Sequence, residues 1–367
     1  MNKLGQHVNA WTSSARGTVR AAPPKVLKVL SSSIDRSEID RWRRARPDGI
    51  LVYRHYFPNE SFDDVAGRCN ALMHAAAQIK EYKLDYVETP WNEAGYSGDD
   101  LRRHNQASVE ATRILQGYGY KVAVGNFSVG WLHIDEHGNS DWPLFYDALS
   151  AADAISIHEY SAPTMQHNQS WHCLRYRRMW ELLPLDCRKP VLITETGIDW
   201  GVLAYELTGW RGGNGAPATP INEYVNQLRW YAEEMAKDSY VLGATIFACG
   251  QFGDWASFDV AAVGEIESLL RETIGEAVQP PVEGNVSPDE FIRWAADKFK
   301  RAGVAFNAEA GLVKFWLDEA RAGRYLGSPE SGEFPSENGR YVLQEFANAI
   351  IHYDRQTGRI ARGIPFV

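Results

Sequence analysis

The sequence predicts an α/β fold, namely a (β/α)8 (TIM) barrel with a small, mainly helical C-terminal domain. The first observation is that eight short apolar runs alternate with helix-like segments over about 275 of the 367 residues. The second is that residues 7–11, His-Val-Asn-Ala-Trp, lack the glycine-rich phosphate turn that an open doubly wound sheet would place after its first strand. A closed barrel is therefore favoured over an open sheet.

The eight predicted strands are short runs rich in Val, Ile and Leu, as expected for buried parallel strands. They cover residues 6–11, 25–30, 49–56, 84–88, 121–126, 154–160, 190–195 and 241–247. The predicted helices, marked by acidic first turns or an apolar face, cover residues 35–45, 62–82, 99–118, 143–152, 169–183, 222–237 and 265–273. Residues 12–24, between the first two strands, are expected to be too short for much helix.

The composition changes at the end of the predicted barrel. Residues 1–278 are assigned to the barrel, and residues 279–286, Gln-Pro-Pro-Val-Glu-Gly-Asn-Val, have the composition of a linker. Residues 287–367 are assigned to an accessory domain, which opens on Ser-Pro-Asp-Glu, a typical helix start. Helices are predicted over 291–302 and 308–322, and short, turn-rich elements over 326–367.

Composition and charge exclude several classes of function. With 44% hydrophobic and 23% charged residues, the chain has the composition of an ordinary globular protein. No apolar run approaches the roughly 20 residues needed to span a bilayer. A net charge of −9 argues against nucleic acid or an anionic membrane as the main partner. The four cysteines have no metal-binding spacing and are expected to be reduced or incidental, with at most one or two disulfides.

Aromatic residues are frequent, and several fall in predicted loops. The chain has 13 Trp, and Trp131, Trp171 and Trp255 are among those in segments without a clear apolar period. An indole face offers apolar area to the C–H face of a sugar ring, and its N–H can bond a hydroxyl group. These residues are candidates for carbohydrate binding, with core packing as the alternative for each one.

Two carboxylates are predicted to face each other across the barrel. Glu195 ends the seventh predicted strand, and Glu93 follows the fourth in the segment Trp91-Asn92-Glu93. Strands four and seven are nearly opposite in a ring of eight, and active sites of these barrels lie at the C-terminal ends of the strands. Two opposed carboxyl groups are what glycosidic cleavage needs: one protonates the leaving oxygen, and the other attacks the anomeric carbon or activates water.

These motifs resemble those of the clan A glycoside hydrolases. The resemblance covers roughly residues 5–275 and rests on Asn92-Glu93 after strand four and Thr-Glu-Thr-Gly, residues 194–197, on strand seven. It implies a retaining hydrolase of β-glycosidic bonds in an oligo- or polysaccharide, acting by double displacement. Glu93 would be the acid/base and Glu195 the nucleophile, with their carboxyl groups about 5–5.5 Å apart. No metal or other cofactor is implied.

The resemblance also suggests residues that contact the substrate. Asn92 would bind the sugar 2-hydroxyl, Tyr160 would orient the nucleophile, and His158 would line the pocket. The remaining candidates lie at predicted strand ends or in loops, and they are Arg54, His55, Trp91, Trp131 and Trp255.

Other interpretations remain open. The barrel could bind carbohydrate without turning it over. Residues 133–137, His-Ile-Asp-Glu-His, match the H-x-x-E-H pattern of a zinc peptidase, but they fall in a predicted loop rather than on a helix. Two further acids are given structural roles: Glu88 inside the barrel, and Glu159 in a salt bridge on the outer face of its strand.

The end of the chain resembles an LGFP-type repeat, a module of cell-wall-associated proteins. The match begins at residues 326–329, Leu-Gly-Ser-Pro, and continues through residues 346–353 and on to Gly363-Ile364. It implies attachment to a cell wall or polysaccharide, and the alternative is a module that only packs on the barrel. The compartment is left open, because no signal peptide is recognised near the N-terminus and the resemblance still allows secretion or envelope association.

Overall fold

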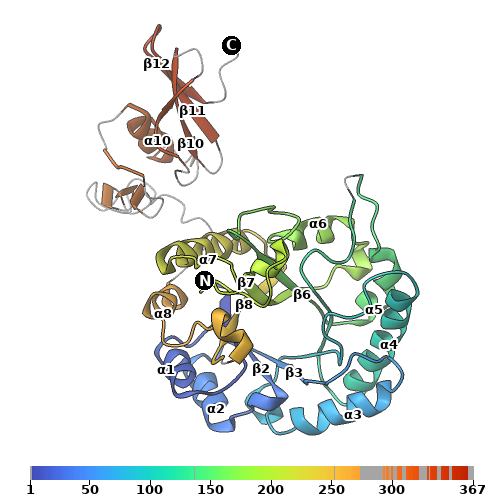
Figure 1. Ribbon diagram of the computed structural model, residues 1–367. Helices are drawn as coiled ribbons and strands as arrows, with labels where there is room; N and C mark the ends of the chain where they lie inside the picture. Colours follow the sequence, from blue (N-terminus) through green and yellow to red (C-terminus); the bar gives the residue numbers. More distant parts are fainter. Residues whose placement is uncertain are drawn as a thin grey trace. The chain divides into compact units, whose positions relative to one another are not determined.

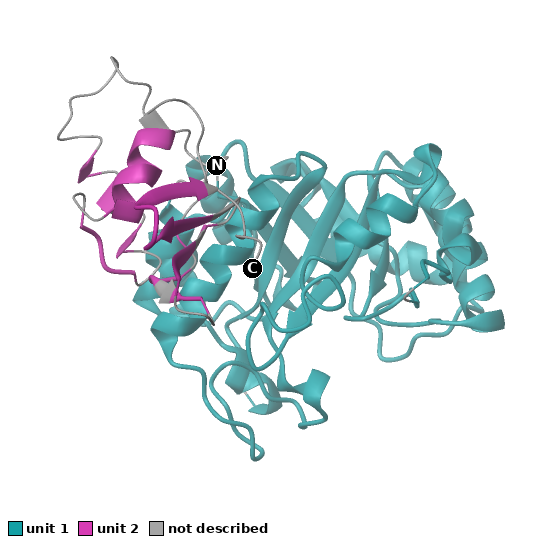
Figure 2. Ribbon diagram, turned by 90° about the horizontal axis from the view of Figure 1, so that it is seen from above, with its two compact units in different colours: residues 1–275 teal, residues 276–367 magenta. Residues whose placement is uncertain are grey.

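The computed structural model describes residues 2–135, 137–251, 253–272, 292–293, 295–296, 299–300, 304–307, 311–321, 329, 331–336, 340–346 and 349–362. The chain divides into two compact units, Met1–Gly275 and Glu276–Val367 (Figure 2). Each has a separate cluster of buried apolar side chains. The predicted linker at 279–286 and the predicted helix start after it lie outside the described residues.

The first unit is a closed barrel of eight parallel strands in sequence order, which confirms the predicted fold (Figure 1). The strands are β1 Leu4–Val8, β2 Val26–Leu30, β3 Ile50–Arg54, β4 Tyr86–Glu88, β5 Val122–Phe127, β6 Ala154–Ser161, β7 Val191–Ile198 and β8 Val241–Cys249. The pairing of β1 with β8 closes the ring.

The helices form a ring around the strands. They are α1 Ser13–Ala21, α2 Arg36–Ala45, α3 Val65–Ala76, α4 Gly98–Gly117, α5 Tyr146–Ala151, α6 Arg175–Leu182, α7 Ile221–Ala236 and α8 Gly264–Arg271. The expectation of little helix between the first two strands was wrong. Thr12 caps α1 by accepting a hydrogen bond from the amide of Ala15, and Ala15, Thr18 and Val19 are buried. A helix of nine residues fits between the first two strands because only a few buried residues are needed to pack against them.

The inside of the barrel is layered from apolar to polar. The first inward-facing residues of the strands, such as Val26, Val52 and Leu192, pack in one small apolar cluster. Two residues further along, the inward side chains are polar and charged, for example Lys28 and Glu88. Because side chains alternate along a strand, this order closes one end of the barrel with hydrocarbon and gathers charge toward the C-terminal end.

A bulge in β7 decides which way Glu195 points. Ile157 of β6 pairs with Ile193, but the next residue, His158, pairs with Glu195, so Thr194 is an extra residue on β7. Thr194 reaches Ser156 inside the barrel, and Glu195 reaches Lys28 there as well. Strict alternation would send one of these two consecutive side chains outward, so the bulge allows both to face the interior.

The second unit contains more sheet than the sequence suggested. Its described residues form helix α10, Gly311–Arg321, and an antiparallel sheet in the order β12-β11-β10-β9. These strands are β9 Phe334–Pro335, β10 Tyr341–Phe346, β11 Ala349–Asp354 and β12 Arg359–Arg362. The short alternating segments resembled turns because each strand has few residues. Residues 326–328 and 363–364 of the proposed repeat lie outside the described part.

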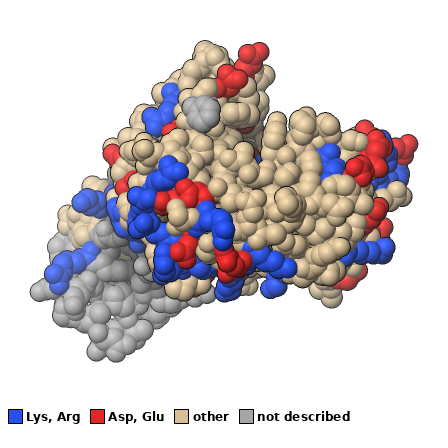
Figure 3. All heavy atoms as spheres, turned by 90° about the horizontal axis from the view of Figure 1, so that it is seen from below, with Lys and Arg blue, Asp and Glu red and all other residues tan. Residues whose placement is uncertain are grey.

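The face drawn in Figure 3 has no large patch of a single charge on the residues that the structure describes. Lys and Arg side chains are interspersed there with Asp and Glu side chains. Among the described residues, no helix has both the length and the apolar character to cross a membrane.

Candidate active site

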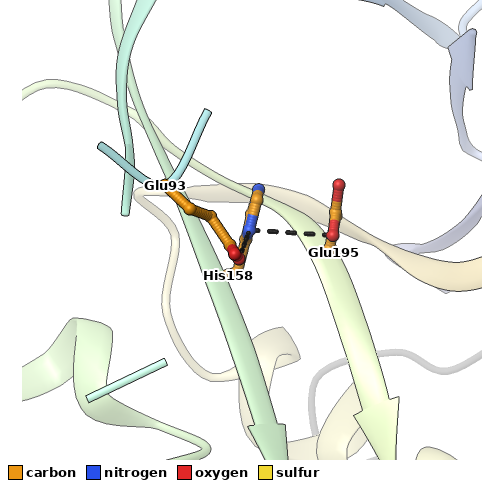
Figure 4. A group of neighbouring side chains, drawn as sticks. All are labelled: Glu93, His158 and Glu195. Atoms are coloured by element: carbon orange, nitrogen blue, oxygen red, sulfur yellow. Dashed lines mark hydrogen bonds and ion pairs between the residues drawn. The ribbon is translucent and has the colours of Figure 1, made fainter. Parts of the chain in front are cut away.

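Three side chains, on or just after different strands, meet at the C-terminal end of the barrel (Figure 4). Glu93 follows β4, His158 is on β6 and Glu195 is on β7. His158 Nδ1 lies 2.7 Å from Glu93 Oε1 and 3.7 Å from Glu195 Oε2. A ligand atom from each of the three falls within 4.8 Å of the other two. The imidazole of His158 therefore lies between the carboxyl groups of Glu93 and Glu195.

Glu195 is held in a buried, positively charged environment. Its Oε1 atom lies 3.3 Å from Lys28 Nζ and 3.2 Å from Arg54 Nη1, and its Oε2 atom accepts a 2.9 Å hydrogen bond from Tyr160 Oη. Burial alone would raise the pKa of Glu195, but the neighbouring imidazoles, Lys28 and Arg54 outweigh it and hold that pKa well below its usual range. Glu195 is therefore a carboxylate at any pH near neutrality.

Of the two imidazoles near Glu195, His7 adds little positive charge at neutral pH. His7 Nδ1 lies 3.5 Å from Glu195 Oε1. Burial, followed by the charge of Lys28, lowers the pKa of His7 well below its usual value, so this imidazole is neutral near pH 7. Since a neutral ring contributes little field, the lowering of the Glu195 pKa comes mainly from His158, Lys28 and Arg54.

A buried polar network beneath Glu195 fixes Lys28. Lys28 and Glu88 are both fully buried, and their charged groups are 3.0 Å apart. Ser156 Oγ donates to Glu88 Oε1 at 2.7 Å and lies 2.8 Å from Thr194 Oγ1. Glu88 therefore has the predicted structural position in the barrel interior. One ammonium group serves two carboxylates, which ties the site to the interior of the barrel.

The segment that carries Glu93 is held in an unusual backbone conformation. Glu93 has φ 53°, in the left-handed region that non-glycine residues rarely adopt. Its amide donates to the carbonyl of Asn126 at 2.9 Å, and Asn126 Nδ2 donates to the carbonyl of Trp91 at 2.8 Å. The side chain of Glu93 is 34% exposed, against 8% for Glu195. Glu93 is thus the accessible acid of the pair.

Of the other polar residues predicted to lie near Glu93 and Glu195, some contact or adjoin one of these acids and one does not. Arg54 and Tyr160 contact Glu195, as given above. Asn92 lies beside Glu93, and its buried Oδ1 atom has no hydrogen-bond partner among the described residues. His55 is further out, with Nδ1 2.9 Å from Tyr53 Oη and its ring against Phe57. The structure gives no contact between His55 and either carboxylate.

The position of Trp91 differs from the sequence-based expectation. It is 1% exposed, packs against Phe62 and His104, and donates from Nε1 to the carbonyl of Ser61. A fully buried indole has no face to offer a sugar, so Trp91 is a packing residue. Its neighbours in the sequence point to the site, but its own side chain points into the layer between strands and helices.

Trp131 and Trp255 remain accessible, at 40% and 41% exposure. Trp131 stacks on Tyr96 with ring centroids 4.9 Å apart. Trp255 contacts Phe247, which in turn lies edge-on to both Tyr160 and His7. Both indoles therefore keep an exposed surface at the strand-end side of the barrel.

Glu159 is buried outside the barrel, as strand alternation predicts, but it makes no salt bridge in the described structure. Its carboxylate accepts hydrogen bonds from the amides of Leu174 and Tyr176 and from Tyr231 Oη. Burial raises the pKa of Glu159 to about 7 despite these donors. The expected partner cation is replaced by the N-terminal amides of α6, a favourable place for a negative charge.

The H-x-x-E-H segment has no zinc-peptidase geometry in its described residues. Residues 133–135 and 137 lie in the loop between β5 and α5, not on one face of a helix. Within the described part of the chain, only Glu93, His158 and Glu195 are close enough together to hold a metal ion.

Sequence reasoning missed Lys28, His7 and Asn126. The signal for Lys28 was a lysine within the otherwise apolar run Val26–Leu30, where a buried charge requires a partner. His7, within β1, carried a weaker form of the same signal. Asn126 gave none, because its role depends on the carbonyls of a segment 35 residues earlier.

No family model matches the sequence, and no curated protein matches it. Among solved structures, the chain is similar to an endo-β-1,3-glucanase of glycoside hydrolase family 128 from Pseudomonas viridiflava, with 14% identity, 73% of this chain and 97% of that chain covered, and a TM-score of 0.44. It is also similar to a family 18 chitinase from Pseudoalteromonas aurantia, with 12% identity, coverage of 69% and 97%, and a TM-score of 0.42. A modular endo-β-1,4-mannanase from Cellulomonas fimi aligns at 12% identity, with coverage of 74% and 71% and a TM-score of 0.44. The barrel itself rests on the closed strand order described above.

Proposed function

We propose that this protein is a retaining glycoside hydrolase that cleaves β-glycosidic bonds of an oligo- or polysaccharide. The observation that carries the proposal is the pairing of a buried, ionised Glu195 with a partly exposed Glu93 at the C-terminal end of one barrel. Glycosidic cleavage needs such a difference between two carboxyl groups, because one must attack as an anion while the other delivers a proton.

The surroundings support Glu195 as the nucleophile. Lys28, Arg54 and Tyr160 together stabilise its negative charge and fix the direction of both oxygens. Burial and the charge of Glu195 raise the pKa of Tyr160 well above its usual value, so the phenol stays protonated and donates. The carboxylate is thus oriented to bond an anomeric carbon.

The surroundings also support Glu93 as the acid/base. Its carboxyl group lies 2.7 Å from His158 Nδ1 and is the more accessible of the two. In the first step, Glu93 would give its proton to the leaving oxygen as the Glu195 oxygen bonds to the anomeric carbon. In the second step, Glu93 would take a proton from water, and that water would displace Glu195.

The spacing of the acids supports retention of configuration. One oxygen of Glu93 and one of Glu195 lie within 4.8 Å. Retaining enzymes place the two carboxyl groups about 5–5.5 Å apart, whereas inverting enzymes need roughly 6.5–9.5 Å to hold a water between acid and base. Two acids whose nearest oxygens are this close fit the shorter, retaining spacing better than the longer one.

The test is hydrolysis of a panel of aryl β-glycosides and β-linked polysaccharides by wild type, Glu195→Gln and Glu93→Gln. Glu195→Gln is expected to lose activity on the order of 10⁴-fold or more on every substrate. Glu93→Gln should lose more on polysaccharides than on aryl glycosides with good leaving groups, because those leaving groups need little protonation. Glu206→Gln, an exposed carboxylate in the loop after β7, is the matched control and should equal wild type.

Two further readouts separate the mechanism from its rivals. An activated 2-fluoroglycoside should add one sugar unit to wild type at Glu195, and NMR of early products should show the retained anomer. Inversion would overturn the retaining mechanism, and loss of activity in EDTA would point to a metal at Glu93, His158 and Glu195. Binding of glycans by wild type with no hydrolysis on any substrate would favour an inactive carbohydrate-binding barrel.

A further inference from the structure

A cavity of about 480 Å³ lies between the loops that follow β5 and β6. Among its lining residues are His133, Asp135, His137, Trp171, His172 and Arg175, and we call it the loop pocket. Its volume is within the range of about 300–1,000 Å³ that is typical of small-ligand sites. None of these residues belongs to the Glu93–Glu195 constellation.

Chain topology places the loop pocket at the same end of the barrel as the two acids. Both of its loops follow the C-terminal ends of strands, which is where Glu93 and Glu195 also lie. A direct link runs through β6, because Tyr160 donates to Glu195 and the next residue, Ser161, has Oγ 3.2 Å from His172 Nδ1. The pocket is thus on the rim of the surface that would receive an extended substrate.

Two arginines of α6 hold the walls of the loop pocket together. Arg175 donates to the carbonyls of Leu132 and Trp171, one from each loop, and is itself 6% exposed. Arg178 donates to the carbonyl of Asp135 at 3.2 Å and also stacks on the Trp171 ring, 3.7 Å from its centroid. The pocket is therefore pre-formed by contacts within the chain.

Trp171 provides an aromatic platform in this pocket. Arg178 covers the ring at 3.7 Å, yet Trp171 remains 40% exposed. A stacked guanidinium fixes the orientation of the ring, which lowers the entropic cost of stacking a ligand on its exposed part. An exposed, rigid indole beside imidazole groups suits the apolar C–H face and the hydroxyl edge of a sugar ring.

The charges in the loop pocket favour a neutral ligand. The carboxylate of Asp135 is engaged by the amides of His137 and Asn139 and by Asn139 Nδ2. Arg175 bonds two carbonyls, and burial lowers the pKa of His172, so that imidazole is neutral near pH 7. A metal is disfavoured, since the described ligand atoms here do not form a compact metal-binding group.

We propose that the loop pocket is a distal subsite that binds a neutral sugar unit of the polysaccharide away from the bond that is cut, with Trp171 as its stacking platform. This assignment rests on the proposed glycoside hydrolase function. It implies that the pocket contributes to binding long substrates and adds nothing for a substrate that is only one or two sugars long.

The test compares wild type, Trp171→Ala, Trp171→Phe and Tyr118→Ala. Tyr118 is 64% exposed and precedes β5, so it is an exposed aromatic residue at the opposite end of the barrel. The probes are soluble β-1,3-, β-1,4- and β-1,6-glucans and mannan. Binding is read as retardation in native gels that contain each polysaccharide, and turnover as kcat and KM on the polysaccharides and on aryl β-glycosides.

Trp171→Ala is expected to raise KM for the best polysaccharide about tenfold, equivalent to about 1.4 kcal/mol, with unchanged kcat and unchanged kinetics on aryl glycosides. Trp171→Phe should recover most of the loss, and Tyr118→Ala should equal wild type. If wild type cuts a polysaccharide and Trp171→Ala binds and cuts it equally well, the subsite proposal is wrong and the hydrolase proposal is unaffected.

The remaining outcomes are also decisive. A polysaccharide could retard wild type but not Trp171→Ala while no substrate is hydrolysed. This result would support the subsite proposal and overturn the hydrolase proposal. Neither binding nor hydrolysis by wild type would overturn both. Calorimetry with zinc chloride provides the last check: tight zinc binding that His133→Ala removes would reassign the pocket from sugar to metal.

Discussion

At the scale of single residues, the site depends on one buried lysine. Lys28 joins Glu88 and Glu195, and all three side chains are less than 10% exposed. Burying an ion pair gives little net stability, because desolvation offsets the attraction, but removing one partner leaves a charge uncompensated. Lys28 should therefore matter for both folding and the charge state of Glu195.

We expect Lys28→Met to lower the free energy of unfolding by about 3–5 kcal/mol, measured by urea denaturation at pH 7. It should also shift the acid limb of kcat/KM upward, because the Glu195 carboxylate loses a neighbouring cation. Lys25→Met is the matched control. Lys25 pairs with Asp48 near the surface, so its loss should cost less than about 1 kcal/mol. Equal effects of the two substitutions would contradict the role given to Lys28.

At the scale of elements, β6 and β7 carry most of the site, and each is anchored from its outer side. On β7, Gly197 has φ 147° and lies so close to α7 that an added Cβ would be 2.6 Å from Tyr224 Oη. On β6, Glu159 sits between His158 and Tyr160 and bonds the N-terminal amides of α6 and a tyrosine of α7. These anchors fix the strand ends that present His158, Tyr160 and Glu195.

Gly197→Ala is expected to lower the free energy of unfolding by about 1–3 kcal/mol through overpacking against Tyr224. Tyr224→Phe alone should cost little, since the buried Tyr224 hydroxyl has only a weak interaction with the backbone of Ile198. The double variant should recover part of the loss, and a double-mutant cycle by thermal or urea unfolding measures this coupling. If the effects of Gly197→Ala and Tyr224→Phe simply add in the double variant, the contact with Tyr224 is not the cause of the lost stability.

Glu159 should make stability depend on pH. Its pKa is about 7 in the folded state, above the value of about 4.3 expected when unfolded. The folded state therefore binds the proton more tightly, so this stabilisation is complete below pH ~4 and is lost as pH rises through 7.

We expect the stability advantage of wild type over Glu159→Gln to shrink between pH 4.5 and 7.5, by an amount on the order of 3 kcal/mol. Urea denaturation across this range measures it. The control is Glu181→Gln, which removes an exposed carboxylate of α6, the helix whose first amides bond to Glu159, and should run parallel to wild type. A constant difference between wild type and Glu159→Gln would mean that Glu159 does not change its protonation on unfolding.

At the scale of the whole molecule, the two units have separate cores. The apolar cluster of the barrel draws only on residues before Glu276, whereas the second cluster includes Phe299, Trp316, Phe346 and Ile351. A core that is complete within one unit predicts that this unit folds alone.

A chain truncated after Gly275 is accordingly expected to unfold cooperatively with a Tm within a few degrees of the barrel transition of the full protein. Its kcat on aryl glycosides should be unchanged, since every residue of the proposed site lies before that point. Calorimetry and steady-state kinetics test both statements. An insoluble or inactive barrel would show that the second unit is required, in contrast to the domain division predicted from the sequence.

The sequence by itself determined the barrel and its two acids. Strand periodicity is a local signal, and eight repeats of strand and helix leave few ways to bury the apolar faces. Glu93 and Glu195 stand next to strand ends that chain order alone assigns to opposite sides of the ring. The buried position of Trp91 did not follow from its place in the sequence, because the turn after β4 sends neighbouring side chains in different directions.

Only the tertiary structure decided how Glu195 is held. Lys28 is 167 residues away from it, and the pair forms only when the ring closes. The extra residue in β7 turns Glu195 inward beside Thr194, and such a bulge depends on the register with β6 and β8 rather than on local sequence. Charge pairing and register are properties of neighbours in space, so they follow from the closed barrel and not from the order of residues in one strand.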